Sequence, residues 1–338
     1  MQPDQCTYGS DKNGLVWGYL FEPGVPAIQI ISDTAAEWIA AKVKKPENAF
    51  LWLHFSLSNV SSEPWIRRHL ALPDAFYESF HEGVGSTRLE QEDDSLVATI
   101  HDVLFDFSFD VSAVSTVSLC ILPYILVSAR RKPLRSVDHL RASVKSGQLF
   151  RSSAELLAHL LTDQANVLVG IIRQSTIRID AIEDKLLDNR ISVSRSELGS
   201  LRRVLVRLQR LLAPEPAAFF RLLNKPPRWI SGEDLQVLRE AAEEFSSAVV
   251  DSGALTERIK LLQEEIAASI SEQTSRTLYI LTVVTVMAIP INLAAGLFGM
   301  NVAGIPLSTY KHGFIVIVGI LAVLTALIAY LAFGKHQE

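Results

Sequence analysis

The sequence has few cysteines and long stretches without charge. Its two cysteines, Cys6 and Cys120, lie far apart and form no CxxC pair, which argues against a disulfide framework and a cysteine-based metal site. No acidic or basic residue occurs at 277–310 or at 313–334. The N-terminus carries neither a basic n-region nor an apolar h-region, so no cleavable secretory signal is visible.

Several function classes lack their signatures. The net charge is −5, and no basic stretch interleaved with aromatic residues is present, so we expect no nucleic-acid partner. The arginine-rich segment 201–212 has apolar residues at helical spacing and predicts an amphipathic helix. There is no GxSxG, P-loop, HExxH or Rossmann fingerprint, so we expect neither an enzyme nor a bound cofactor.

The two uncharged segments predict two transmembrane helices, at 277–298 and 313–334. Each covers the ~20 residues that a helix needs to cross a hydrocarbon core of roughly 30 Å. Two spans return the chain to its starting side, and Lys335 after the second span fits a cytoplasmic tail at 335–338. Lys311 in the connecting loop weakens that charge signal.

Residues 1–135 predict a cytoplasmic α/β domain within an α+β membrane protein. Aromatic and β-branched segments between Gly, Pro and Asn indicate strands, and the alternation on both sides of Asp93 and Asp94 indicates a hairpin. The predicted strands lie in 14–21, 26–31, 49–57, 87–107, 115–123 and 124–131, and short helices are expected in 63–70 and 73–82.

Residues 136–276 predict a region of long helices that acts as a stalk. A capping box at Ser194–Glu197 indicates one helix start, and Ser231 offers another N-cap. Behind Ser231 the helical pattern meets no proline until Pro290. We therefore expect one helix to continue into the first span, with a length on the order of 100 Å.

One face of the first span carries small and polar residues. At 100° per residue, Leu278, Leu281, Thr285, Asn292 and Gly299 share this face. An asparagine is costly in hydrocarbon, so Asn292 is expected to face either a wet lumen or a partner helix. Two helices alone enclose no aqueous path. The hairpin is therefore either a simple anchor or one part of a pore built from several copies.

The tripeptide Gly299-Met300-Asn301, after an uncharged span and before a short loop and a final span, resembles the signature of the CorA metal ion transporter family. The segments 196–223 and 278–306 are similar to the ZntB zinc transporter branch of that family. The loop at 299–312 is free of acidic residues, whereas magnesium-type members usually carry an acidic loop. This difference favours the zinc branch.

The resemblance implies a homopentameric funnel in a bacterial inner membrane, with multiple spans and both termini cytoplasmic. Five copies of the first span would surround a central pore, and 299–312 would form a periplasmic loop. Asn301 would form a ring at the pore mouth, held by the turn at Gly299 and Met300. Asn292, Thr285, Leu281 and Leu278 would face the lumen. The implied partners are copies of the same chain, divalent metal cations and the lipid bilayer.

The transported ion is expected to be Zn²⁺ on the resemblance alone. Zinc prefers Cys and His ligands, yet 277–310 contains no Cys, His, Asp or Glu, so the pore has no site for dehydrated zinc. His312 is a weak candidate for a metal or proton site, or a plain interfacial side chain. His81 and His101, beside Glu82 and Asp102, are weak candidates for a regulatory metal site, or part of a solvated surface.

Three functions remain open from the sequence. The first is proton-coupled zinc uptake through a pentameric pore. The second is a passive Mg²⁺, Co²⁺ or Ni²⁺ channel of the same family. The third, of another class, is a membrane-anchored scaffold or sensor that conducts no ions.

Overall fold

The structure, a computed structural model, describes residues 9–41, 49–81, 87–110, 113–187, 191–300, 306 and 311–334. The chain folds as two compact units, 1–262 and 263–338. The boundary falls inside one long helix, α8 (Gly232–Phe298), which belongs to both units. Each unit is described by itself below.

The first unit is built on a mixed sheet. Its seven strands are ordered β2-β1-β3-β7-β6-β5-β4. β3 and β7 pair in parallel, and the other neighbours pair antiparallel. The strands are β1 (Leu15–Phe21), β2 (Ile28–Ile30), β3 (Phe50–Ser56), β4 (Arg88–Glu92), β5 (Ser95–Val103), β6 (Val114–Leu122) and β7 (Ile125–Arg130).

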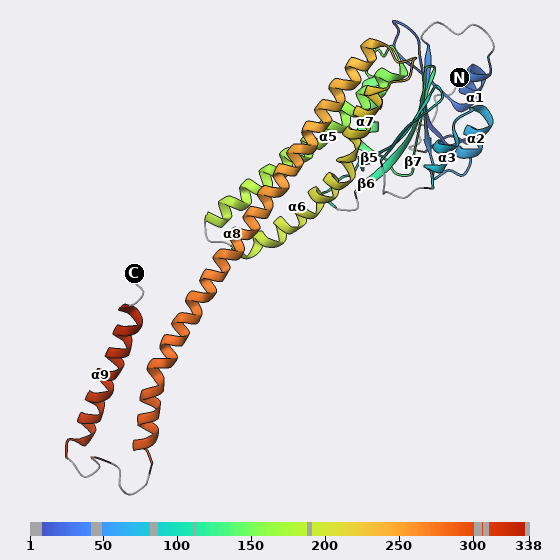
Figure 1. Cartoon of the computed structure of the whole chain (residues 1–338). Coiled ribbons are helices and arrows are strands. Elements are labelled where there is room, and N and C mark those ends of the chain that lie inside the picture. The colour runs from blue at the N-terminus through green and yellow to red at the C-terminus, as the bar shows by residue number, and fades with distance from the viewer. Residues whose placement is uncertain are drawn as a thin grey trace. The chain divides into compact units, whose positions relative to one another are not determined.

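Three short helices cover one face of this sheet (Figure 1). They are α1 (Ser32–Ala40), α2 (Ser62–His69) and α3 (Asp74–Glu78). Trp65 and Ile66 of α2 and Phe76 of α3 pack against Leu53 and Phe55 of β3. Alternate strand residues point to opposite faces, so the neighbouring residues of β3 are available to the other face.

Longer helices cover the opposite face. They are α4 (Arg135–Lys145), α5 (Ser153–Leu187), α7 (Pro214–Asn224) and the first turns of α8. Phe50 and Trp52 of β3 belong to this core with Leu157 of α5 and Phe219 of α7. A smaller cluster packs α6 (Ile191–Leu212) against α5 and α8 through Leu208 and Phe245. Both faces of the central strands are thereby buried, and every residue of β5 and β7 is at most 9% exposed.

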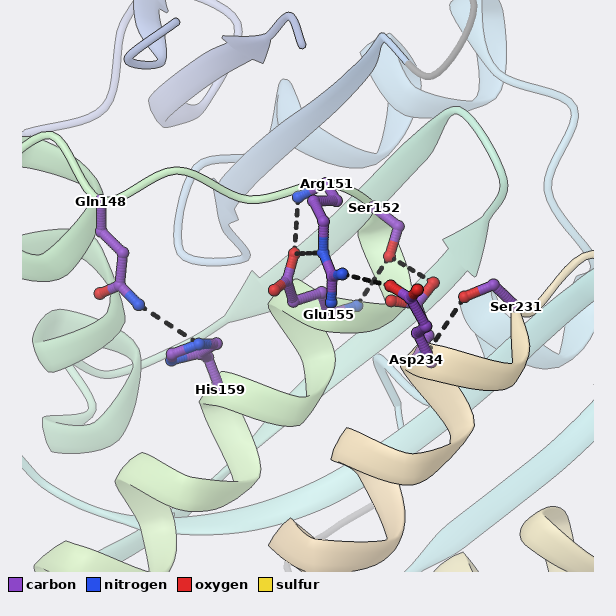
Figure 2. A network of polar contacts seen from close by, with 8 residues as sticks. Gln148, Arg151, Ser152, Glu155, His159, Ser231 and Asp234 are labelled. Atoms are coloured by element: carbon purple, nitrogen blue, oxygen red, sulfur yellow. Dashed lines mark hydrogen bonds and ion pairs between the residues drawn. The ribbon is translucent and has the colours of Figure 1, made fainter. Parts of the chain in front are cut away.

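A polar network joins the first turns of α5 and α8 (Figure 2). The Ser152 hydroxyl accepts from the Glu155 N–H at 2.9 Å and donates to the Asp234 carboxylate at 2.9 Å. The Ser231 hydroxyl accepts from the Asp234 N–H at 3.1 Å and caps α8. Arg151 pairs with Glu155 and with Glu233. Each helix start is thus capped by a serine hydroxyl, and the bond from Ser152 to Asp234 joins the two starts.

Most of the expected elements are confirmed. The predicted strands are present, Asp93 adopts the positive φ of 51° that a tight hairpin turn requires, and Ser231 caps α8 as predicted. The helix start predicted at Ser194 is wrong, because α6 already begins at Ile191. A capping-box sequence does not mark the start of a helix when the preceding residues are also helical. Helix α1 was not predicted.

The second unit contains the end of α8 and helix α9 (Gly313–Gly334). Both have windows long and apolar enough to cross a membrane, and only 6% of each window is buried within the chain. A third helix, α5, passes the same test of length and hydropathy, but 56% of its window is buried. Its apolar side packs on the sheet, so α5 is a core helix, as the sequence predicts for a long helix outside the two spans.

Candidate functional site

The threonine hydroxyls in the described part of the second unit bond to carbonyl groups of their own helices. Thr282 and Thr285 donate to the carbonyl oxygens of Leu278 and Leu281, each at 2.8 Å. Thr325 of α9 donates to the Leu321 carbonyl at 2.7 Å. Such bonds to the residue four positions earlier let a hydroxyl sit in an apolar environment at little cost. These threonines therefore need no partner outside their helix.

Asn292 differs from these threonines. Its side chain is exposed on α8 and makes no hydrogen bond to another described residue. Two residues earlier, Pro290 lies inside the helix. It lacks the N–H from which the Val286 carbonyl would otherwise accept a hydrogen bond. The middle of this membrane segment therefore carries an amide and a carbonyl that need water or another chain, because lipid offers no hydrogen bonds.

Because α8 is helical without a break up to Phe298, the residues of its predicted small and polar face form one continuous stripe. Leu278 and Leu281 are 57% and 61% exposed, and Thr285 is also exposed. Asn292 lies two turns after Thr285 along the same stripe. Within one chain these described residues are exposed, so the stripe is free to face water, lipid or another chain.

α8 ends directly before the Gly299-Met300-Asn301 tripeptide. The Gly299 N–H donates to the Ala295 carbonyl at 2.9 Å. A Cβ at Gly299 would lie 2.9 Å from that same oxygen. Gly299 does not adopt the left-handed region, so the glycine is favoured by close approach of backbone and not by a positive φ. Met300 is 52% exposed, and Asn301 lies outside the described residues.

An apolar hollow of about 600 Å³ lies between the membrane helices of this unit. Met287 and Ile291 line it from α8, and Val318, Leu321, Ala322, Thr325, Ala326 and Ala329 line it from α9. The hollow is an open groove on the surface of the two helices, and in a bilayer lipid chains or another subunit would cover it.

The histidine candidates do not converge on a metal site. The part of the chain that the structure describes contains no group of three or more His, Cys, Asp or Glu placed to hold a metal ion. His312 is exposed just before α9. The His81 ring lies 4.0 Å from the Glu63 carboxylate with its side chain 73% exposed, and Glu82 lies outside the described residues.

The expectation of a solvated surface at His101 and Asp102 is wrong. Both residues are buried in β5, at 1% and 4% exposure. The Glu215 carboxylate at the start of α7 accepts from the His101 N–H at 2.6 Å and lies 3.1 Å from its Nδ1. Gln164 of α5 donates to the His101 carbonyl at 2.5 Å. This cluster fastens α5 and α7 to the sheet.

Burial governs the electrostatics of this cluster. Desolvation raises the pKa of Glu215, against the opposing effect of its hydrogen bonds from His101 and Gln164. Sequence reasoning missed Glu215 entirely. The available signal was a carboxylate between Pro214 and Pro216 at a helix start, where an acidic side chain can accept hydrogen bonds at a fixed position.

A family model described as "CorA-like Mg2+ transporter protein" matches residues 47–335. The chain belongs to this family. It is therefore a membrane transporter of divalent cations with C-terminal transmembrane helices, and the family is not enzymatic. The Gly299-Met300-Asn301 tripeptide and the uncharged helix before it are the sequence features that predicted this family.

Two kinds of curated relatives span nearly the whole chain. The chain is 26% identical over 315 residues to the "Divalent cation transporter CmaX" of Pseudomonas aeruginosa, which covers 92% of each protein. It is 23% identical over 287 residues to the "Zinc transport protein ZntB" of Yersinia enterocolitica, which covers 85% of this chain and 87% of the relative. The relatives thus carry two different cargo descriptions, divalent cations and zinc.

Solved structures show the same fold. The full-length CmaX structure matches with a TM-score of 0.81 at 23% identity, covering 96% of this chain and 99% of that one. The CorA magnesium transporter from Methanocaldococcus jannaschii matches with a TM-score of 0.72 at 16% identity, covering 93% and 96%. The predicted order of a sheet domain, a long helix and two terminal apolar helices is confirmed.

Proposed function

We propose that this CorA-family transporter is a homopentamer whose central pore is lined by the stripe from Leu278 to Asn292 on α8. The observation that carries the proposal is the exposed Asn292 amide in the middle of an uncharged span. Five copies around one axis would place this amide and the open Val286 carbonyl beside water or a neighbouring helix instead of lipid.

The end of α8 supports a cation path in particular. The carboxyl end of a helix carries a partial negative charge of about −0.5 e, and α8 ends at Phe298, next to the proposed Asn301 ring. Amide oxygens can hydrogen-bond the water shell of an arriving cation without removing it. Conduction requires binding that is favourable but weak, which neutral amides supply better than a ring of carboxylates would.

We propose zinc as the cargo, taken up with protons. The named zinc transporters among the relatives support the ion, and the proposal extends that name to this chain. The described part of the span offers no Cys, His, Asp or Glu, so zinc would cross with its hydration shell and not on protein ligands.

The direct test is zinc uptake by the full chain reconstituted in liposomes, with and without an imposed pH gradient. We expect zinc entry that rises when the proton gradient points in the same direction, and a large loss of flux in Asn301→Ala. Zinc entry that is indifferent to the gradient would contradict proton coupling. A protein that passes no divalent metal, with or without the substitution, would point to the scaffold or sensor instead.

Two threonines offer a matched pair for locating the pore. Thr285 on α8 and Thr325 on α9 make the same bond to their own helix, at 2.8 and 2.7 Å. Substitution by valine therefore removes the same kind of bond at both positions. We expect Thr285→Val to lower zinc flux about fivefold, the rate equivalent of ~1 kcal/mol, and Thr325→Val to leave it unchanged. Equal effects would place the path elsewhere.

A passive divalent cation channel is the second candidate. It is favoured by the relative named simply as a divalent cation transporter, which covers 92% of the chain, and by the Mg²⁺ transporter description of the family. This candidate predicts flux of Mg²⁺, Co²⁺ and Ni²⁺ that follows each metal gradient alone. Parallel uptake of the four metals in the same liposomes separates it from proton-coupled zinc transport.

A further inference from the structure

The carboxyl ends of the two parallel strands meet at one edge of the sheet. β3 and β7 pair in register from Leu51 with Ile125 to Ser56 with Arg130. The chain leaves β3 toward α2, whose residues pack in the core on one face. It leaves β7 toward α4, whose residues pack on the opposite face. Neighbouring strands whose connections diverge in this way open a crevice, where α/β proteins commonly bind ligands.

A cavity of about 320 Å³ occupies this edge. It is lined by Gly9, Ser10, Val16, Ser56, Ser58, Asn59, Arg130, Arg131, Lys132 and Pro133. Three of these described lining residues are cationic, three carry hydroxyls, and none carries a carboxylate. The charge of the lining is thus opposite in sign to the net charge of −5 for the whole chain. A concave surface lined by one sign of charge concentrates ions of the other sign.

The Arg130 side chain is held in place by buried residues of the sheet. It is only 9% exposed, and its Nε donates to Nε2 of His54 at 2.7 Å. His54 therefore accepts at Nε2, carries its proton on Nδ1, and donates it to the Ser128 hydroxyl at 2.7 Å. Trp52 Nε1 donates to the same hydroxyl at 2.9 Å. This buried chain of bonds fixes the guanidinium at the cavity wall.

The neutral state of His54 agrees with this geometry. The residue is fully buried, and desolvation, followed by the charges of Arg130 and Arg141, lowers the pKa of His54 well below its usual value. A neutral imidazole accepts a hydrogen bond from Arg130 and leaves its positive charge in place. A carboxylate in the same position would neutralise that charge. The positive charge of Arg130 thereby stays available to the cavity.

Hydrogen bonds between the three loops hold the cavity open. The Ser58 hydroxyl donates to the Arg131 carbonyl at 3.1 Å, joining the segments after β3 and β7. Asn59 Nδ2 donates to the Ser10 hydroxyl at 3.1 Å, joining the segment before β1. Arg131 Nη2 donates to the Phe80 carbonyl at 2.7 Å. A preformed site of this kind needs little ordering when a ligand binds.

We infer that this crevice binds a phosphate-bearing small molecule. Its phosphate oxygens would contact Arg130, Arg131 and Lys132, because guanidinium and ammonium groups make charge-assisted hydrogen bonds to phosphate. Val16 and Pro133 supply an apolar wall for the rest of the ligand. The cavity is large enough for more than one inorganic phosphate and lies at the lower end of the volumes of small-molecule sites, about 300 Å³.

The test is ligand binding to the full chain in detergent and metal-free buffer, measured by calorimetry and by the thermal midpoint. Inorganic phosphate, ATP and a short-chain phosphatidylglycerol are the probes, and they separate a free phosphate, a nucleotide and a lipid headgroup. We expect one of them to bind and to raise the midpoint. If none of the three binds at millimolar concentration, the inference is wrong.

Charge reversal at an exposed wall residue tests the location. Lys132→Glu changes an exposed side chain and is expected to weaken binding about tenfold or more, as loss of one charged contact does. Lys225→Glu makes the same change on an exposed residue after α7, away from the cavity lining, and should bind like the wild type. Equal weakening in both variants would show a general charge effect and overturn the site. Because the readout is binding, the result does not depend on the transport proposal.

Discussion

The buried carboxylate of Asp102 makes the stability of the first unit depend on pH. Asp102 Oδ1 accepts from the Val103 N–H and the Ser136 hydroxyl, and Oδ2 accepts from the Ser136 N–H, all at 2.8 Å. Ser136 lies in the first turn of α4. Burial raises the pKa of Asp102 from 3.8 to about 7, against the opposing effect of the bonds from Ser136 and Val103.

The sign follows from proton binding. Because the folded pKa of Asp102 exceeds its unfolded pKa, the folded state holds more protons between about pH 4 and pH 7. The contribution of Asp102 to stability is therefore present below this window and is lost as the pH rises through it. At ~1.4 kcal/mol per unit of pKa, the full loss is roughly 4 kcal/mol. About half of this loss falls between pH 5 and pH 7.

The assay compares the wild type with Asp102→Asn, which cannot ionise. Thermal unfolding of the full chain in detergent is followed by tryptophan fluorescence from pH 5 to pH 8. We expect the wild type to lose roughly 2 kcal/mol relative to Asp102→Asn between pH 5 and pH 7, or about 4–8 °C in the difference of midpoints. Asp106→Asn, at an exposed position in the following loop, controls for loss of one negative charge.

A difference between wild type and Asp102→Asn that stays constant over this range would refute the reasoning. It would mean that the three donors stabilise the ionised carboxylate as well as water does. Since one of those donors is a backbone N–H at the start of α4, its helix dipole also favours the charged form. The experiment therefore measures whether desolvation or the hydrogen-bond donors have the larger effect on the pKa of Asp102.

Three further substitutions test local features of the two units. Gly14→Ala should cost at least about 2 kcal/mol, because Gly14 has a φ of +85° and a Cβ there would lie 1.9 Å from the Ser62 hydroxyl; an unchanged melting midpoint would contradict this. Gly253→Ala should raise the midpoint by the equivalent of roughly 0.5–1 kcal/mol, since the only close atoms belong to the flexible Gln209 side chain, 2.9 Å away; a lowered midpoint would show that this side chain does not move. Asn292→Leu should abolish zinc flux while the oligomer mass in detergent stays the same if the amide faces the lumen, whereas dissociation of the oligomer would show that Asn292 joins helices instead.

Local patterns were sufficient to predict most elements of the fold. The β5 strand and its hairpin partner alternate or run apolar over lengths typical of strands. The two membrane segments are recognisable because each exceeds the length that a bilayer requires without a single charge. Helix α1 has no comparable signal, since only Ser32 and Ala35 among its residues are buried and its apolar stripe is short.

Contacts between distant parts of the chain were not predictable from the same patterns. His101 and Asp102 are polar residues in a strand, and sequence alone favours a solvated edge for them. They are buried because α5 and α7 pack over β5, and Glu215, 114 positions away from His101, supplies the acceptor. A single sequence contains no signal for that pairing. The crevice at the ends of β3 and β7 is of the same kind, because it exists only once the parallel pairing is known.

The membrane unit gives a physical reason to expect that several chains assemble. Apolar side chains on α8 and α9 can face lipid at no cost, so they impose no partner. The threonine hydroxyls bond to their own helices and impose none either. What remains in the described span is the Asn292 amide and the carbonyl freed by Pro290. These few unsatisfied groups lie inside the span, where an unpaired polar group is costly, and they are the physical reason to expect that α8 contacts water or another chain.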